Sequence, residues 1–321
     1  MKLLFLTILL LLFQTPLLLG QADSTTYDFG DFGGIVYLDS LVVTASRQGF
    51  DVQDFIRKVR EDKSFYAAFD NLRTLSYQSD NTIVMYRKNG KEKAAYRGKI
   101  QQYSDGDCRV MEVIDEQISG NFFKRRKSRK HRYYTAKMHD RLFYSWGKIC
   151  ESKVVEPKKP RGMDKHVAEL KKLIFQPGER AEVPLIGKKM EIFSKKMQPF
   201  YNYSISSERY RDIADCYVFT ARVKPAFLKK KAGKTVFKLL KTYFDKESWQ
   251  IVARDYELRY KSPLFDFDVK MNVELGTFEG HYIPELIQYD GYWDIPAKKP
   301  EISQFSLKFY QFEPAQPLPE G

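Results

Sequence analysis

The chain has 321 residues, and its 54 Lys and Arg outnumber 41 Asp and Glu, giving a formal net charge of +13 at pH 7. Its 24 Phe and 21 Tyr favour strands over helices. Three cysteines are too few for a scaffold built on disulfides, so a hydrophobic core must hold the fold together.

Residues 1–22 have the features of a secretory signal peptide. Lys2 precedes an apolar run from Leu3 to Phe13, and Gly20-Gln21-Ala22 places small residues at the third and the last position before a cleavage site. We therefore expect an exported protein of the periplasm or of the periphery of the outer membrane. An uncleaved anchor is the alternative, but Gln14 interrupts a run that needs about 20 apolar residues to span.

Residues 23–50 are expected to form a flexible leader followed by a β segment. The next region, residues 51–152, should open with two helices, since Asp51 and Ser64 are suitable N-caps. The positions that share one apolar face are Val52, Phe55, Ile56 and Val59 in the first helix and Phe65, Ala68, Phe69 and Leu72 in the second. We expect both helices to cover the core.

A first antiparallel meander is predicted from residue 82 to about residue 144. Thr82–Arg87 and Lys93–Gln102 flank Asn89-Gly90, the strongest short hairpin signal. Asp105-Gly106 marks the next turn, before the strand Arg109–Ile118. Residues 153–163, rich in Pro and Lys, are predicted to be a linker or exposed loop.

A second helix-plus-meander region, residues 164–315, is expected to be continuous with the first. Asp164 can cap a short helix, and Phe265–Leu275 alternates apolar and polar residues without a break. Further strands are predicted at Asn202–Ser206, Tyr217–Val223, Thr235–Phe244, Trp249–Tyr260, Tyr282–Tyr289 and Phe305–Phe312. Asp245–Ser248 should form a tight hairpin, and Arg254-Asp255 a bulge. The fold class is therefore α+β, mainly antiparallel, with a few helices covering the sheet.

A basic run between Phe122-Phe123 and Tyr133-Tyr134 is the sharpest local feature. Its cations are Lys124, Arg125, Arg126, Lys127, Arg129, Lys130 and Arg132. One interpretation is a patch that meets an anionic lipid or lipopolysaccharide surface. The other is a solvated hairpin loop whose flanking aromatic residues begin the strands. Nucleic acid is not expected as a partner, because the signal peptide directs the chain out of the cytoplasm.

No motif indicates catalysis, a metal or a cofactor. The four histidines have no metal-ligand spacing, and Asp266 and Asp268 share the wet face of an alternating strand. We expect no enzyme, although a site assembled from distant residues stays open. One disulfide among Cys108, Cys150 and Cys216 is possible, as are three buried thiols, and the sequence does not choose between them.

Asp39-Ser-Leu-Val-Val-Thr-Ala-Ser-Arg47 resembles the TonB box of outer-membrane receptors. In that family the segment adds an edge strand to the energy-coupling protein. The resemblance implies a partner-docking strand with Asp39, Leu41, Val42, Val43 and Thr44. An ordinary strand of the protein's own sheet is the alternative.

The order of elements, with a helix, hairpins, an inserted helix and a second meander, resembles the LolA and RseB group of periplasmic half-barrels. The hairpin at Tyr243–Arg254 is similar to one that those proteins often carry. The resemblance implies a curved sheet around an apolar cavity, for acyl chains or a hydrophobic peptide. The chain as a whole resembles uncharacterised envelope proteins of Bacteroidetes-type bacteria.

Three functions follow as hypotheses. The first is an exported envelope protein that binds an apolar ligand on a curved sheet. The second is an accessory protein of an outer-membrane complex, docked through residues 39–47. The third is an envelope enzyme with a dispersed site.

Overall fold

The computed structural model describes residues 36–38, 52–125, 129–144, 146–150, 187–228, 233–261, 266–295 and 298–319. All of them belong to one unit of the chain, Ile35–Gly321. The expected signal peptide, the leader, the segment 39–47, the linker 153–163 and the helix after Asp164 lie outside the described residues.

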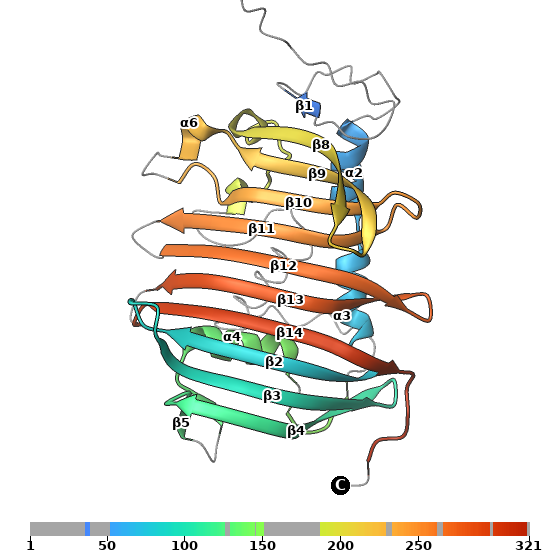
Figure 1. Ribbon diagram of the computed structural model, residues 1–321, viewed down its shortest axis with the longest axis vertical. Helices are drawn as coiled ribbons and strands as arrows, with labels where there is room; N and C mark the ends of the chain where they lie inside the picture. The colour runs from blue at the N-terminus through green and yellow to red at the C-terminus, as the bar shows by residue number, and fades with distance from the viewer. Residues whose placement is uncertain are drawn as a thin grey trace, which may run out of the picture. The chain divides into compact units, whose positions relative to one another are not determined.

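A 12-stranded antiparallel sheet dominates the unit (Figure 1). From edge to edge the strands are β1 (Val36–Leu38), β8 (Tyr201–Tyr210), β9 (Ala214–Val223), β10 (Phe237–Asp245), β11 (Ile251–Lys261), β12 (Asp266–Phe278), β13 (His281–Asp294), β14 (Glu301–Glu313), β2 (Ser76–Tyr86), β3 (Glu92–Ser104), β4 (Cys108–Gly120) and β7 (Ile149–Cys150). Pairing of β14 with β2 joins the two meanders in one sheet. The sheet is open, with β1 and β7 at its ends, so the expected α+β fold with a mainly antiparallel sheet is confirmed.

Alternation along the strands separates an apolar face from a polar face. In β12 the residues Phe267, Val269 and Met271 are buried on one face, whereas Asp268 and Lys270 lie on the other. The register carries this division across the sheet, because Met271 lies opposite both Tyr256 of β11 and Tyr289 of β13. The face of the sheet on which the Met271 side chain lies is called the apolar face below.

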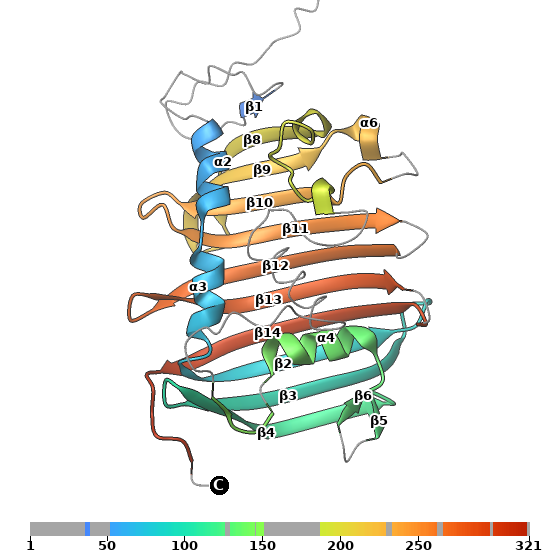
Figure 2. The same ribbon diagram turned by 180° about the vertical axis from the view of Figure 1, so that it is seen from behind.

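Three helices pack on the apolar face, namely α2 (Val52–Glu61), α3 (Ser64–Asn71) and α4 (Tyr134–Phe143), as Figure 2 shows. Phe55 of α2 contacts the rings of Phe219 and Phe244 at centroid distances of 6.4 and 5.5 Å. The two expected helices at residues 52–72 are therefore confirmed. The N-cap differs, because Ser64 is inside α3 and its N–H donates to the carboxylate of Asp62 at 3.1 Å.

Residues 134–143 form α4, where the sequence predicted strands. Glu301 of β14 explains the difference, since its carboxylate accepts hydrogen bonds from the N–H groups of Tyr134 and Thr135 at 2.8 and 2.9 Å. The Thr135 hydroxyl donates to the same carboxylate at 2.8 Å. The cap that this helix needs thus comes from a distant strand, and no local pattern announces it.

The bulge expected at Arg254-Asp255 lies elsewhere in β11. The register of β10 and β11 shifts between Tyr243 and Phe244, opposite Ala253 and Ile251, and is regular at Arg254. Arg254 is fully buried on the apolar face, where it pairs with Asp62 at 3.0 Å. Its guanidinium lies over the Phe65 ring at 4.3 Å. This charged residue therefore keeps the alternation, because a helix-side partner neutralises it.

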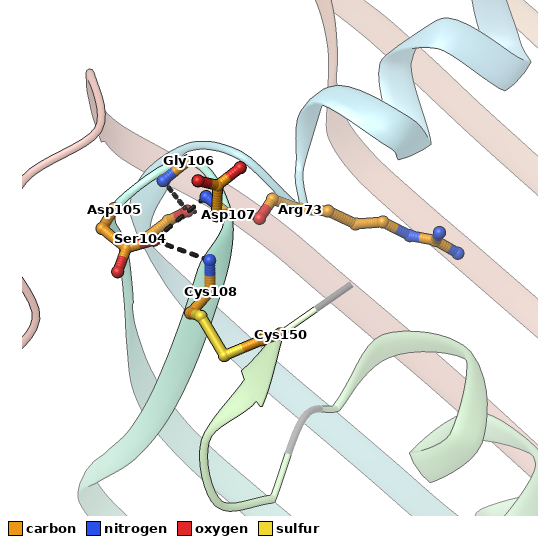
Figure 3. Close-up of a disulfide and its surroundings, with 7 residues drawn as sticks. All are labelled: Arg73, Ser104, Asp105, Gly106, Asp107, Cys108 and Cys150. Atoms are coloured by element: carbon orange, nitrogen blue, oxygen red, sulfur yellow. Dashed lines mark hydrogen bonds between the residues drawn. A yellow bond between two sulfur atoms is a disulfide. The ribbon is translucent and has the colours of Figure 1, made fainter. Parts of the chain in front are cut away.

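One disulfide joins Cys108 of β4 to Cys150 of β7 (Figure 3). The turn before Cys108 is held by Asp105, whose carboxylate accepts hydrogen bonds from the N–H groups of Cys108 and Asp107 at 2.6 and 3.0 Å. Cys216 is a free, buried thiol, and burial raises its pKa to about 11. The alternative of three buried thiols is thus wrong.

Candidate ligand-binding face and basic pocket

A row of aromatic rings crosses the apolar face from β11 to β14. Tyr260 contacts Phe267 at 6.4 Å between ring centroids, and Phe267 stacks on Trp293 at 4.8 Å. The Trp293 indole N–H donates to the Tyr289 hydroxyl at 2.6 Å, and the Tyr289 ring stacks on Phe305 at 4.7 Å. These five residues are called the aromatic row.

The row is only partly covered. Tyr260 and Phe267 are 6% and 3% exposed, whereas Tyr289, Trp293 and Phe305 are half-buried. The row lies near the ends of β11, β13 and the start of β14, whereas α2 and α3 cover the opposite ends of these strands (Figure 2). Large apolar rings are thus accessible on a face whose other side chains are mostly buried.

Glycines let two tyrosines lie flat on this face. A Cβ atom on Gly291 would collide with the Tyr289 ring, and one on Gly98 would collide with the Tyr96 ring. An aromatic ring that covers a glycine two positions along its strand replaces the packing that the glycine lacks. The glycine therefore fixes where the Tyr289 ring lies in the aromatic row.

Buried polar groups of two side chains adjoin the row, those of His139 on α4 and of Tyr144 at the C-terminal end of that helix. The His139 ring packs against Phe305 and Tyr144 at 5.0 and 5.4 Å. Within the described part of the chain, both His139 ring nitrogens and the Tyr144 hydroxyl lack a hydrogen-bond partner. Burial lowers the pKa of His139 to about 3, so its imidazole is neutral. Neutral polar groups of this kind suit the polar part of an otherwise apolar ligand.

A basic pocket of about 1390 Å³ lies beside the start of α4. Three separate parts of the chain line it, namely the β2–β3 hairpin, residues within 120–124 and 129–140, and residues 292 and 298–302. Its cations are Arg87, Lys88, Lys93, Lys124, Arg129, Lys130, Arg132, Lys137, Lys298 and Lys299. The carboxylates that line it are Asp140 and Glu301.

Both carboxylates are already engaged. Glu301 caps α4, and Asp140 contacts His131 Nε2 at 3.1 Å and the Trp146 indole N–H at 2.7 Å. Of the pocket's cations, Arg129 pairs with Glu116 at 2.6 Å and lies over the Trp146 ring at 4.8 Å. None of the pocket's other cations forms an ion pair with a carboxylate of the described residues. The pocket therefore carries a large excess of positive charge.

The predicted basic patch and this pocket overlap in part. Lys124, Arg129, Lys130 and Arg132 line the pocket, and Arg125 is exposed on β5 (Phe123–Arg125). Arg126 and Lys127 lie outside the described residues. Strand β6 (Lys130–His131) pairs with β5 in an antiparallel hairpin. The hairpin-loop interpretation expected a strand to begin at Tyr133-Tyr134, but Tyr134 begins the helix α4.

Sequence reasoning missed the cations from the other hairpins. Arg87-Lys88 and Lys298-Lys299 are visible as basic pairs at turns, between β2 and β3 and between β13 and β14. Their meeting depends on the pairing of β14 with β2, which brings the β2–β3 and β13–β14 connections together at one end of these strands. No short sequence pattern indicates that β14 pairs with β2. The docking strand Asp39–Thr44 lies outside the described residues and stays a prediction.

A second cavity, of about 640 Å³, lies over the polar face. Asp255 in its lining accepts hydrogen bonds from the Tyr243 hydroxyl and the Asn272 amide, each at 2.7 Å. The aspartates weighed as a carboxylate pair are also engaged, since Asp266 pairs with Lys261 at 3.1 Å and Asp268 with Arg259 at 2.6 Å. These carboxylates therefore make contacts within the sheet.

No known family model and no curated protein matches the chain. Among solved structures it is similar to a DUF1329 family protein from Desulfovibrio piger (11% identity, 80% of this chain and 93% of that chain, TM-score 0.24). It is also similar to a LolA superfamily protein from Nitrosomonas europaea (11% identity, 82% and 94%, TM-score 0.25). A third is a Vibrio parahaemolyticus domain whose description names outer-membrane lipoprotein sorting (8% identity, 80% and 94%, TM-score 0.25).

The solved structures to which the chain is similar thus include a LolA superfamily protein, in agreement with the resemblance in organisation that the sequence predicted. At these TM-scores it carries no conclusion about the ligand. The TonB-box resemblance of residues 39–47 and the Bacteroidetes-type resemblance stay predictions. Among the described helices, none is both long and apolar enough to cross a membrane.

Proposed function

We propose that the protein is an exported envelope protein that binds the acyl chains of an amphiphile along the aromatic row. The observation that carries this proposal is the partial exposure of Tyr289, Trp293 and Phe305 on an apolar face. Ligand sites are typically lined by aromatic and apolar side chains with a few convergent polar groups. The row, together with the neutral ring of His139, has this composition.

Acyl chains fit the row better than a hydrophobic peptide does. A bound peptide needs partners for its backbone N–H and C=O groups. At a sheet face those groups of the protein are already paired between strands, as they are at Trp293 and Tyr289. An acyl chain has no such requirement, so burial of its apolar surface is sufficient.

Export is supported by two independent features. Residues 1–22 match a signal peptide, and Cys108–Cys150 is a disulfide, which persists mainly in oxidising compartments. A place in the periplasm or at the periphery of the outer membrane agrees with both. We propose a binding protein and no enzyme, because the carboxylates near the cavities are engaged in structural contacts.

Quenching of tryptophan fluorescence by dibrominated stearate tests the proposal. The chain has three tryptophans, Trp146, Trp249 and Trp293, and bromine quenches only at close range. In a variant with Trp146→Phe and Trp249→Phe we expect saturable quenching of Trp293. The matched variant keeps Trp249 alone, with Trp146→Phe and Trp293→Phe, and should show little quenching.

Two results would contradict the proposal. One is the absence of quenching of Trp293 at concentrations below the micelle limit. The other is equal quenching of Trp293 and Trp249, because Trp249 packs against Phe55 of α2, away from the aromatic row.

A further inference from the structure

We propose that the basic pocket binds an anionic phosphate headgroup, carried by the amphiphile whose acyl chains lie on the aromatic row. This inference rests on the proposed function. It assigns a ligand chemistry to cations that come from three separate parts of the chain.

The first argument is the convergence of charge. Arg87 and Lys88 come from the β2–β3 hairpin, Lys124 and Lys130 from the β5–β6 hairpin, and Lys298 from the β13–β14 connection. Cations in one concave site repel each other, which costs stability unless an anion neutralises them. The fold nevertheless gathers them where β2 ends and β14 begins.

The second argument is the contrast with cations elsewhere on the sheet. Arg97 pairs with Glu92 at 2.9 Å, and Arg259 and Lys261 each pair with an aspartate of β12. Each of these three cations therefore has a carboxylate partner, on its own strand for Arg97 and on the neighbouring strand β12 for Arg259 and Lys261. In the pocket the acidic partners are Asp140 and Glu301, and both already bind other groups.

The third argument concerns the kind of anion. A cavity of about 1390 Å³ is far larger than one carboxylate requires, and its donors surround the space from several sides. Arg and Lys side chains are the usual partners of phosphate, Arg as a planar fork and Lys as a point charge. The start of α4 is occupied by Glu301, so side-chain cations are the donors that remain. A phosphate group matches this arrangement, because its oxygens accept from several cationic donors at once.

The fourth argument is the contact between the pocket and the apolar face. Glu301 lines the pocket and lies directly opposite Trp293 of the aromatic row in the β13–β14 register. Tyr133 lines the pocket and is also buried in the apolar cluster with Phe122. A headgroup in the pocket therefore places its acyl chains at the row.

Titration calorimetry with three soluble probes tests the inference. The probes are inorganic pyrophosphate, dihexanoyl phosphatidate and dihexanoyl phosphatidylcholine. One variant combines Arg87→Gln with Lys88→Gln, and another combines Lys298→Gln with Lys299→Gln. All four side chains are exposed, so both variants should fold. The matched control combines Lys195→Gln with Lys196→Gln, an exposed pair that does not line the pocket.

We expect each pocket variant to bind pyrophosphate and phosphatidate about tenfold more weakly, with phosphatidylcholine binding unchanged. The control pair should leave all three affinities unchanged. Phosphatidate should also bind more tightly than either of the other probes, since it fills both parts of the site.

Three outcomes would overturn the inference, and they separate it from the proposed function. Equal loss in the control pair shows a general charge effect. If phosphatidate binds no more tightly than phosphatidylcholine, the headgroup site is refuted, whereas the proposed binding of acyl chains still stands. Pocket-dependent binding of pyrophosphate with no binding of either lipid makes the pocket a site for free phosphate and refutes the proposed function too.

Discussion

At the residue scale, Gly291 controls the aromatic row. Its missing side chain leaves the place that the Tyr289 ring occupies, and the ring's hydroxyl accepts the Trp293 N–H there. An added methyl group must push the ring away, because packed interiors do not absorb extra atoms freely.

We expect Gly291→Ala to lower the free energy of unfolding by about 1–3 kcal/mol, the usual cost of overpacking. Urea denaturation measures this loss. In a Tyr289→Ala background the same substitution should cost much less, because the ring with which it collides is gone. An equal cost in both backgrounds would show that the collision is not the cause.

Buried His139 makes the stability of the protein depend on pH between 6.5 and about 3. Burial lowers its pKa from 6.5 to about 3, so the folded protein binds fewer protons than the unfolded chain between these values. The stability from its neutral form is complete above pH 6.5 and is lost as the pH falls toward 3. Besides burial, Asp140 raises the pKa of His139 and His131 lowers it.

Between pH 6.5 and pH 5 this loss amounts to on the order of 2 kcal/mol at 1.36 kcal/mol per pKa unit. We expect His139→Leu to remove most of the decline over this interval, where few carboxylates titrate. Urea unfolding at both pH values provides the measurement. A variant with the slope of the natural protein would refute this role of His139.

At the element scale, α4 depends on a cap from another strand. The sequence around Tyr134 favours strands, and the helix forms because Glu301 supplies the acceptor that its first N–H groups need. The same contact holds α4 over β14 and closes one side of the basic pocket.

We expect Glu301→Ala to destabilise the protein by about 1–2 kcal/mol, as the loss of an N-cap does. Hydrogen exchange should show faster exchange of the backbone amides of α4 in this variant. Glu112→Ala, a change at an exposed carboxylate of β4, is the control and should have little effect. Exchange that rises equally in α2 and α4 would contradict a local role for Glu301.

At the scale of the whole molecule, the disulfide ties the short edge strand β7 to β4. It closes a loop with a sequence separation of 42. We expect the double substitution Cys108→Ser and Cys150→Ser to lower the free energy of unfolding by about 4 kcal/mol, from the loop entropy of the unfolded chain. Cys216→Ser, which leaves the disulfide intact, is the control. An equal loss in both variants would show that buried sulfur, and not the cross-link, provides the stability.

The sequence predicted the parts of the fold that have local periodicity. Residues 267–273 alternate between apolar and polar within one strand, and Phe55, Ile56 and Val59 follow helical spacing within one or two turns. Both patterns can be recognised from a few neighbouring residues. The strand β7 and the helix α4 could not be predicted from the sequence. Strand β7 has only two residues, and α4 is capped by a residue 166 positions away from Thr135.

The candidate site was predictable only in part for the same reason. The run from Lys124 to Arg132 is contiguous and therefore visible, whereas Lys298 joins it only through the pairing of β14 with β2. The aromatic row likewise unites residues of four strands. Long-range strand pairing leaves no short signal in the sequence, so the site as a whole requires the structure.

Mass spectrometry of an organic extract tests the central claim, acyl binding on the aromatic row, most directly. The protein would be purified from its native envelope without detergent, beside a variant with Trp293→Ser and Phe305→Ser. A control variant carries Tyr66→Ser, at an aromatic residue of α3 that is 52% exposed. We expect a stoichiometric phosphorylated lipid from the natural protein and the control, and much less from the double variant. No lipid from any of the three, or the same amount from all of them, would contradict the claim.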